Sequence, residues 1–140
     1  MNEFDLNSFL PYQLSVAAAR VSRDFAERYR REFGLSIPEW RVLAHLSQAG
    51  AVSVREIHAR VDMDKSKVSR AATRLEAAGY ILKVTDAADR RLVQLSLTPS
   101  GQDLLGRILP IANAYQSELM TLLGDNVTEF RQSLTKIVQS

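Results

Sequence analysis

The chain has 140 residues, which is the size of one domain or of one subunit of a small oligomer. Its hydrophobic content of 46% is ordinary for a globular protein, and its net charge of +2 does not by itself indicate a nucleic-acid partner. The absence of cysteine excludes a disulfide framework, a thiolate nucleophile and a cysteine-based zinc site.

The first predicted helix runs from about Ser8 to Phe33. Apolar residues recur along it every three or four positions, Pro11 is tolerated in its first turn, and Gly34 ends it. The helix is long for a chain of this size. We therefore expect its N-terminal part to extend beyond the body of the domain.

A second helix begins at Ser36 and stops at Gly50. Ser36 and Glu39 have the spacing of a capping box, in which each side chain bonds the backbone N–H of the other residue. Trp40 on this helix is interpreted as a core residue, because tryptophan is highly buried on average. The alternative is that Trp40 lines a ligand pocket.

Two shorter helices joined by a tight turn follow. Ser53 and Glu56 have the spacing of a second capping box, and Asp62 or Asp64 can cap the next helix. Gly79 is placed to end that helix, because glycine adopts a left-handed conformation without steric cost. Its predicted buried face consists of Val68, Ala71, Ala72, Leu75 and Ala78.

The opposite face of the same helix carries cationic and small hydroxyl side chains. Lys and Arg neutralise phosphate, Arg also bridges guanine O6 and N7, and Ser and Thr donate to either. A recognition helix presents its N-terminal residues to the major groove, so this face predicts DNA contact; the alternative is a solvated surface. The face consists of Lys65, Ser66, Lys67, Ser69, Arg70, Thr73 and Arg74, and all but Thr73 are candidate DNA contacts.

Two short apolar runs, residues 80–85 and 92–98, predict a β-hairpin. In the second run apolar and polar residues alternate with the period of a half-buried strand. Arg90 and Arg91 lie at the tip, where an arginine is able to enter a narrow minor groove, and Asp89 is placed to orient the guanidinium. The alternative is a polar turn with two ordinary arginines.

A long apolar helix then begins with Thr98 as its cap and Pro99 in its first turn, and it ends at Gly124. A last helix begins at Asn126. We expect the apolar faces of the first helix and of these two to bury against one another or against a second subunit. The side chains of the last helix that are predicted to point inward are Phe130, Leu134, Ile137 and Val138.

Four short segments, in this order and spacing, resemble the winged helix-turn-helix of the MarR transcriptional regulators. They are Asp64–Arg70 (DKSKVSR), Leu75–Tyr80 (LEAAGY), Asp89–Arg91 (DRR) and Leu97–Gly101 (LTPSG). The last two resemble the family's D-x-R wing signature and the L-T-x-x-G that starts its next helix. The length and the flanking helices also fit, so the resemblance covers essentially the whole chain.

The resemblance implies a mainly α (α+β) fold with one MarR-type domain, residues 1–140. It implies that residues 36–98 form the winged helix-turn-helix DNA-binding region and that residues 1–35 and 99–140 form the dimerisation helices. The expected partners are a second copy of the chain and a double-stranded, pseudo-palindromic operator with half-sites about 10 base pairs apart.

Similar proteins are mostly repressors that leave DNA when a small, often aromatic and anionic ligand binds between the dimerisation helices and the winged helix. The resemblance therefore implies a small-molecule effector. A cation among aromatic side chains suits a ring that bears a carboxylate. The candidate pocket residues are Tyr12, Ser15, Ala19, Trp40, Arg41 and Tyr115, with packing and surface roles as the alternative.

Two other function classes stay open: a winged-helix module for protein–protein contact, which usually lacks a basic recognition face, and a DNA-binding protein that does not regulate. Nothing indicates an enzyme or a cofactor, and two histidines on separate predicted helices do not predict a metal site. No apolar stretch approaches transmembrane length, and the N-terminus lacks the basic region of a signal peptide. We therefore expect a cytoplasmic protein with no membrane partner.

Overall fold

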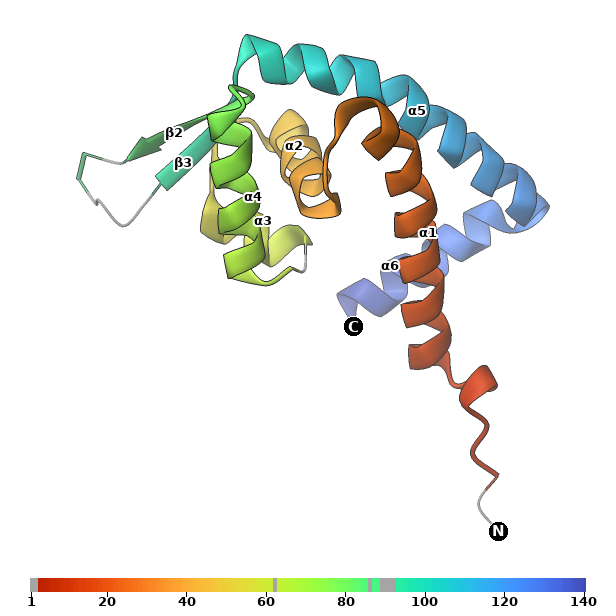
Figure 1. The fold of residues 1–140 in the computed structure, drawn as a ribbon. Coiled ribbons are helices and arrows are strands. Elements are labelled where there is room, and N and C mark those ends of the chain that lie inside the picture. The colour runs from red at the N-terminus through yellow and green to blue at the C-terminus, as the bar shows by residue number, and fades with distance from the viewer. Residues whose placement is uncertain (1–2, 62, 86, 89–92) are drawn as a thin grey trace.

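The computed structural model describes residues 3–61, 63–85, 87–88 and 93–140. Helices dominate the fold, and one small antiparallel sheet completes it (Figure 1). The predicted class, mainly α with a winged helix-turn-helix, is confirmed. The helices are α1 (Leu10–Phe33), α2 (Ile37–Ala49), α3 (Val54–Val61), α4 (Lys65–Ala77), α5 (Pro99–Leu123) and α6 (Val127–Gln139), the strands are β1 (Val52–Ser53), β2 (Ile81–Thr85) and β3 (Val93–Leu97), and single 3-10 turns lie at Leu6–Ser8 and Gly124–Asn126.

The helix ends predicted from capping residues are confirmed. Gly34 ends α1 with a φ of 68°. At the start of α2 the Ser36 hydroxyl accepts a hydrogen bond from the Glu39 N–H, and the Ser36 N–H donates to the Glu39 carboxylate, so the capping box is complete. The Ser53 hydroxyl accepts from the N–H in the first turn of α3 at 3.1 Å. These local bonds satisfy N–H groups that have no partner within their helices.

The sheet has the strand order β1-β3-β2, and both pairs are antiparallel. The sequence does not predict β1, because two residues make a strand only through their pairing, here of Val52 with Leu95 and Ser53 with Gln94. The predicted hairpin is β2 and β3. Its alternation is confirmed, since Leu95 is fully buried while Gln94 is exposed.

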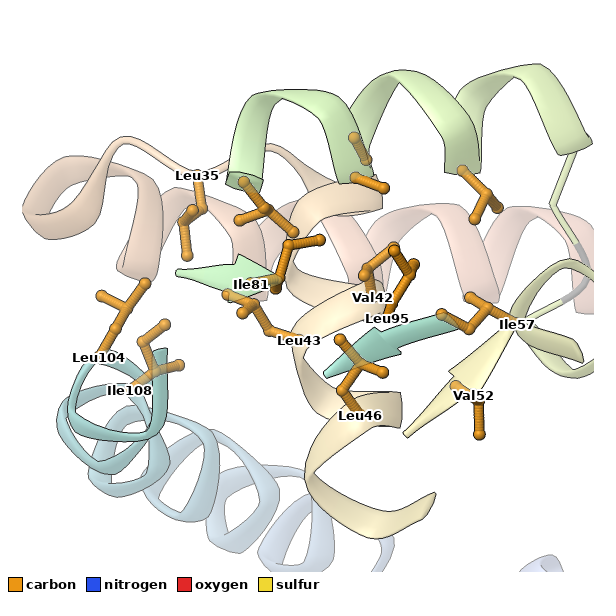
Figure 2. Packing of buried hydrophobic residues seen from close by; sticks show 14 of the residues in the cluster. Leu35, Val42, Leu43, Leu46, Val52, Ile57, Ile81, Leu95, Leu104 and Ile108 are labelled. Carbon is orange, nitrogen blue, oxygen red and sulfur yellow. The ribbon is translucent and has the colours of Figure 1, made fainter. Parts of the chain in front are cut away.

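One apolar core joins α2, α3, α4, the sheet and the first half of α5 (Figure 2). Leu43, Ile57, Leu75 and Leu95 are fully buried within it, and Leu104 of α5 is 1% exposed. Burying a side chain of this size stabilises a fold by about 1.5 to 3 kcal/mol. The core therefore fixes the orientation of α4 relative to α2 and α3.

Hydrogen bonds tie the start of α5 to the end of α4. The Thr98 hydroxyl donates to the carbonyl oxygen of Gly79 at 2.7 Å and accepts from the N–H of Gly101 at 3.0 Å. The Thr98 N–H donates to the carbonyl oxygen of Tyr80 at 3.0 Å. Thr98 thus caps α5, as predicted, and also fixes α5 to the turn that leads into β2.

The predicted buried face of α4 is correct except at its end. Val68, Ala71, Ala72 and Leu75 are fully buried. Ala78 is exposed, so its assignment to that face is wrong. The reason is that α4 ends at Ala77 and the chain turns toward β2 through Gly79, whose φ is 85°.

The two ends of the chain extend beyond this core. Figure 1 shows the N-terminal half of α1 leaving the body, and α1, which is described in full, has its buried side chains, Ala26 and Tyr29, in its second half. In α6, every residue of which is described, no side chain is buried. The prediction that the apolar residues of α6 point inward is therefore wrong within one chain: Phe130 and Leu134 are exposed, Ile137 is 52% exposed and Val138 83% exposed. An apolar stripe on a helix normally packs against another apolar surface, and within this one chain the stripe of α6 remains exposed to solvent.

Candidate nucleic-acid interface

The turn between α3 and α4 is built by two local interactions. Asp64 caps α4, since its carboxylate accepts a hydrogen bond from the Ser66 N–H at 3.2 Å. Hydrogen bonds from Ser66 and the nearby Arg70 and Lys67 lower the pKa of Asp64, so it is ionised at neutral pH. The imidazole Nδ1 of His58 on α3 contacts the carbonyl oxygen of Met63 in the turn.

The face of α4 opposite the core is basic and open to solvent. Lys65, Ser66, Lys67 and Arg70 are exposed, and Ser69 is half-buried. None of the three cations forms an ion pair within the part of the chain that the structure describes. Because the fully buried residues alternate with these positions, packing of the core directs the cations outward. The structure thus gathers five of the predicted DNA-contacting residues on one free face.

Arg74, a sixth predicted contact, is engaged within the protein. Its Nε lies 3.4 Å from the Oε1 of Glu39 at the start of α2. Glu39 also accepts a 2.7 Å hydrogen bond from the Ser36 hydroxyl. The sequence shows Glu39 as half of a capping box, and its contact with α4 depends on how the two helices pack.

Lys83 of β2 is a residue that the sequence prediction did not single out. Its Nζ donates to the hydroxyl of Thr73 on α4 at 3.1 Å and lies 3.8 Å from the Oε1 of Glu76. The signal in the sequence is the strand period: position 83 shares the face of the buried Ile81, the face that packs against the body. Lys83 therefore links the hairpin to α4.

The predicted tip residues Asp89, Arg90 and Arg91 lie outside the described residues. The two strands that carry the tip are described in full, with Ile81 opposite Leu97 and Thr85 opposite Val93. The base of the hairpin is thus fixed against α4 and α5, and the contacts proposed for its tip stay predictions.

A pocket of about 280 Å³ lies between α1, α2 and α5. It contains two of the predicted ligand-binding residues, Trp40 and Tyr115, together with Phe25. Tyr12 and Ser15 are on the exposed half of α1 and do not line it. Arg41 donates to the hydroxyl of Ser22, a lining residue, at 3.3 Å. The remaining lining residues are Val21, Ala112, Gln116 and Leu119.

The aromatic side chains that line this pocket lie next to an ion pair between α1 and α5. The ring of Tyr115 stacks on Phe25 with centroids 5.8 Å apart, and Trp40 meets Phe25 edge to face at 5.2 Å. The guanidinium of Arg28 lies 4.7 Å from the Tyr115 centroid and donates to Glu118 on α5 at 2.8 Å. The hydrogen bond from Arg28 lowers the pKa of Glu118, and burial raises the pKa of Tyr115. Trp40 has both of the roles considered for it, because it packs half-buried against the core and also lines the pocket.

Among the described residues, no three histidine, aspartate or glutamate side chains come together as metal ligands. No helix of the described ranges is both long enough and apolar enough to cross a membrane.

The sequence is similar to those of known regulators of transcription. The model of the MarR family matches residues 33–92, which contain α2, β1, α3, α4 and β2. The transcriptional regulator TtmR of Methylorubrum extorquens is 31% identical over 102 residues, which cover 71% of this chain but about half, 52%, of TtmR. The transcriptional repressor MdtR of Bacillus subtilis is 29% identical over 115 residues, which cover 81% of this chain and 74% of MdtR.

The fold is similar over the whole chain to that of a solved structure. BpsR of Bordetella bronchiseptica, whose DNA binding is regulated by 6-hydroxynicotinic acid, superposes with a TM-score of 0.87 at 23% identity and covers 99% of both chains. The relatives are regulators of transcription, and the winged helix-turn-helix is the part that the family model matches. The chain therefore carries the winged helix-turn-helix of the MarR family of transcriptional regulators.

Proposed function

We propose that the protein is a homodimeric repressor that binds a pseudo-palindromic operator and is released by a small aromatic anion. One observation carries the DNA-binding part: Lys65, Lys67 and Arg70 are exposed, without ion-pair partners among the described residues, and lie together on the first half of α4. Unpaired cations on one face are what neutralisation of successive phosphates requires. Ser66 and Ser69 add hydroxyl groups that can bond base edges or phosphates.

The proposed domain division places DNA contact in residues 36–98 and dimerisation in residues 1–35 and 99–140. Support for the dimer comes from α6 and the N-terminal half of α1, whose apolar side chains are exposed in one chain. Leu122, at the end of α5, is a further apolar side chain that is 81% exposed in one chain. Two-fold pairing through these helices presents two α4 helices, so that half-sites lie about 10 base pairs apart.

The proposed wing contact comes from Arg90 and Arg91, oriented by Asp89. Its support is the position of the hairpin base, which Lys83 and Thr98 fix beside α4. An arginine that enters the minor groove beside the site of α4 would lengthen the sequence that each half-site reads.

The proposed ligand site is the pocket lined by Trp40, Tyr115 and Phe25. Its aromatic walls suit a planar ring, and Arg41 at its edge offers a cation for a carboxylate. BpsR responds to an aromatic acid and MdtR is a repressor, and these properties support a similar response here. Tyr12 and Ser15 would join this site only from a second subunit. A ligand at this junction releases DNA if it prefers a spacing of the two α4 helices that does not fit the operator.

The experiment that tests the function retains fragmented genomic DNA on purified protein at moderate salt and sequences what is bound. A few sites that share a pseudo-palindrome are the expected result. Uniform recovery of all fragments contradicts a specific repressor and indicates an architectural protein, since only the ratio of specific to non-specific affinity separates the two. If nothing is recovered, unfolding and refolding the protein removes any co-purified ligand. Absence of binding after that step contradicts the proposal.

A further inference from the structure

The two halves of α4 differ in how their side chains are used. The first half presents cations that have no ion-pair partner among the described residues, whereas in the second half Thr73, Arg74 and Glu76 all contact other elements. We propose that Arg74 and Lys83 are positioning residues, which fix α4 between α2 and the hairpin, rather than cations that bind phosphate. The proposal rests on the proposed DNA-binding function and assigns these two residues a role within it.

Arg74 contacts α2 through the carboxylate of Glu39, which hydrogen bonds at the start of α2 also hold in position. The side chain of Glu39 is 14% exposed, and the hydroxyl and N–H of Ser36 both donate to it. The Nε of Arg74 completes this set at 3.4 Å. A carboxylate that is already fixed by two donors loses little further freedom when it binds a guanidinium, so the pair specifies the position of α4.

The contact with the hairpin uses a cation that is mostly removed from solvent. The side chain of Lys83 is 27% exposed, and its ammonium lies against Thr73 and Glu76 on successive positions of one face of α4. The Thr73 hydroxyl donates its own proton to the carbonyl oxygen of Ser69 at 3.0 Å, which leaves a lone pair for Lys83. The hairpin is thereby joined to α4 by its side chains, in addition to the junction at Thr98.

The cations of this region therefore fall into two groups, those that are available to phosphate and those that are bound to carboxylates of the protein. A cation with a carboxylate partner must give up that partner to bind phosphate, so Arg74 and Lys83 add less to counterion release than Lys65 or Lys67 do. Their contribution to DNA binding is instead the register between α4 and the hairpin. Register matters for the operator, where both elements contact defined positions, and matters little for binding to any DNA backbone.

The proposal is tested by whether removing a negative charge strengthens or weakens binding to the operator. Glu39→Gln and Glu76→Gln each remove a negative charge near the DNA, and simple electrostatics then predicts tighter binding. The positioning role predicts the reverse: weaker binding to the operator by about two- to fivefold, the value of a partly exposed ion pair. Affinity for scrambled DNA and the dependence on salt concentration stay unchanged. Glutamine at 39 still fits a capping box, so the start of α2 is preserved.

Three further variants complete the set. Lys83→Met retains the aliphatic stem and removes the ammonium; it weakens operator binding without lowering the salt slope, and combining it with Glu76→Gln produces no additional loss. Glu27→Gln, on the exposed surface of α1, is the matched control and changes nothing. A thermal melt of each variant excludes unfolding as the cause. Tighter or unchanged operator binding by the glutamine variants, or a salt slope that falls by about one in Lys83→Met, overturns the proposal.

A measurement without DNA separates this proposal from the proposed function. In hydrogen exchange, the amides of β2 and of the last turn of α4 exchange faster in Glu39→Gln and Glu76→Gln than in the wild type. Unchanged exchange overturns the positioning role. If the wild type selects no site in genomic DNA, the proposed function fails, and the exchange result still decides whether these residues fix α4.

Discussion

Gly101, in the first turn of α5, lies against the backbone carbonyl of Tyr80. A Cβ at position 101 would be 2.1 Å from that oxygen and 3.2 Å from the Cδ2 of Leu97. The oxygen is fixed in place, because it also accepts the N–H of Thr98 at 3.0 Å. The glycine of the L-T-x-x-G segment is therefore required by a close approach of helix to backbone.

A pair of glycine substitutions in α5 tests this requirement. Gly101→Ala should lower the free energy of unfolding by about 1 to 3 kcal/mol, the usual cost of overpacking. A Cβ at Gly106, which is also in α5, would meet no atom within 4 Å. Gly106→Ala should therefore raise the free energy of unfolding by about 0.5 to 1 kcal/mol, because alanine favours helix. Urea denaturation measures both. Equal effects of the two substitutions would contradict the close approach.

Removing the cap of α4 should reduce stability in a way that depends on pH. Asp64→Ala leaves the Ser66 N–H without its acceptor and should lower the melting temperature by about 2 to 5 °C at neutral pH, whereas Asp64→Asn retains an acceptor and loses less. The pKa of Asp64 is lower in the folded state, so its carboxylate stabilises the fold above the unfolded pKa of about 3.9. This stabilisation disappears as the pH falls through the folded pKa. Melts of wild type and Asp64→Ala should therefore converge in acid; a gap that is constant with pH argues against the carboxylate.

Lys67→Ala should weaken binding to every DNA sequence. If Lys67 neutralises one phosphate, the slope of log affinity against log salt should decrease in magnitude by about one. Titration of the operator and of scrambled DNA at several salt concentrations measures both quantities. Lys136→Ala, which removes the same charge from α6, is the control and should change neither. A loss confined to the operator would instead make Lys67 a reader of bases.

A charge on the apolar stripe of α6 should separate the proposed dimer. Ile137→Asp places a carboxylate where an apolar contact is expected, while Gln132→Asp adds a carboxylate to the opposite, polar face of α6. Light scattering should show a dimer for the wild type and for Gln132→Asp and a smaller species for Ile137→Asp. Identical masses for all three proteins would place the dimer contact elsewhere.

Tyr29 should make the fold sensitive to alkali. Burial raises the pKa of Tyr29 to about 12, because the phenolate is disfavoured among apolar neighbours. The neutral phenol is thus favoured by folding, and this stabilisation is complete below the unfolded pKa of about 10 and is lost as the pH rises through the folded value.

Substitution by phenylalanine isolates the titration of this group. Tyr29→Phe should lose less unfolding free energy than the wild type between about pH 9 and pH 12. Tyr12→Phe, at an exposed position, should follow the wild type. Chemical denaturation at each pH gives the comparison, and parallel curves for wild type and Tyr29→Phe would show that the phenol is not protected.

Local signals in the sequence predict the elements of this fold well. Ser36, Ser53, Asp64 and Thr98 each act within three residues of their position, so their spacing alone locates four helix starts. Gly79 marks the end of α4 in the same way. By contrast β1, with two residues, exists only through its pairing with β3, and no local pattern indicates it.

Contacts between elements are what the sequence could not supply. Its charge pattern places Arg74 with the other cations of α4, but the packing of α4 on α2 brings Arg74 to Glu39. The apolar stripe of α6 predicts a face that packs against another surface, and it gives no information about which surface that is. Of the predicted pocket residues, Trp40 and Tyr115 line one pocket, whereas Tyr12 lies on the exposed half of α1.

The free first half of α4 has a consequence for how such a regulator diverges. Ser66, Lys67 and Arg70 bond no other element in the part of the chain that is described, and the fully buried Val68 and Ala71 between them carry the packing. Substitutions at the three outward positions therefore alter the chemistry offered to DNA at little cost in stability. After gene duplication, one copy can acquire a new target through a few such changes while it keeps the same scaffold, and a designer who wishes to redirect this protein has the same positions to vary.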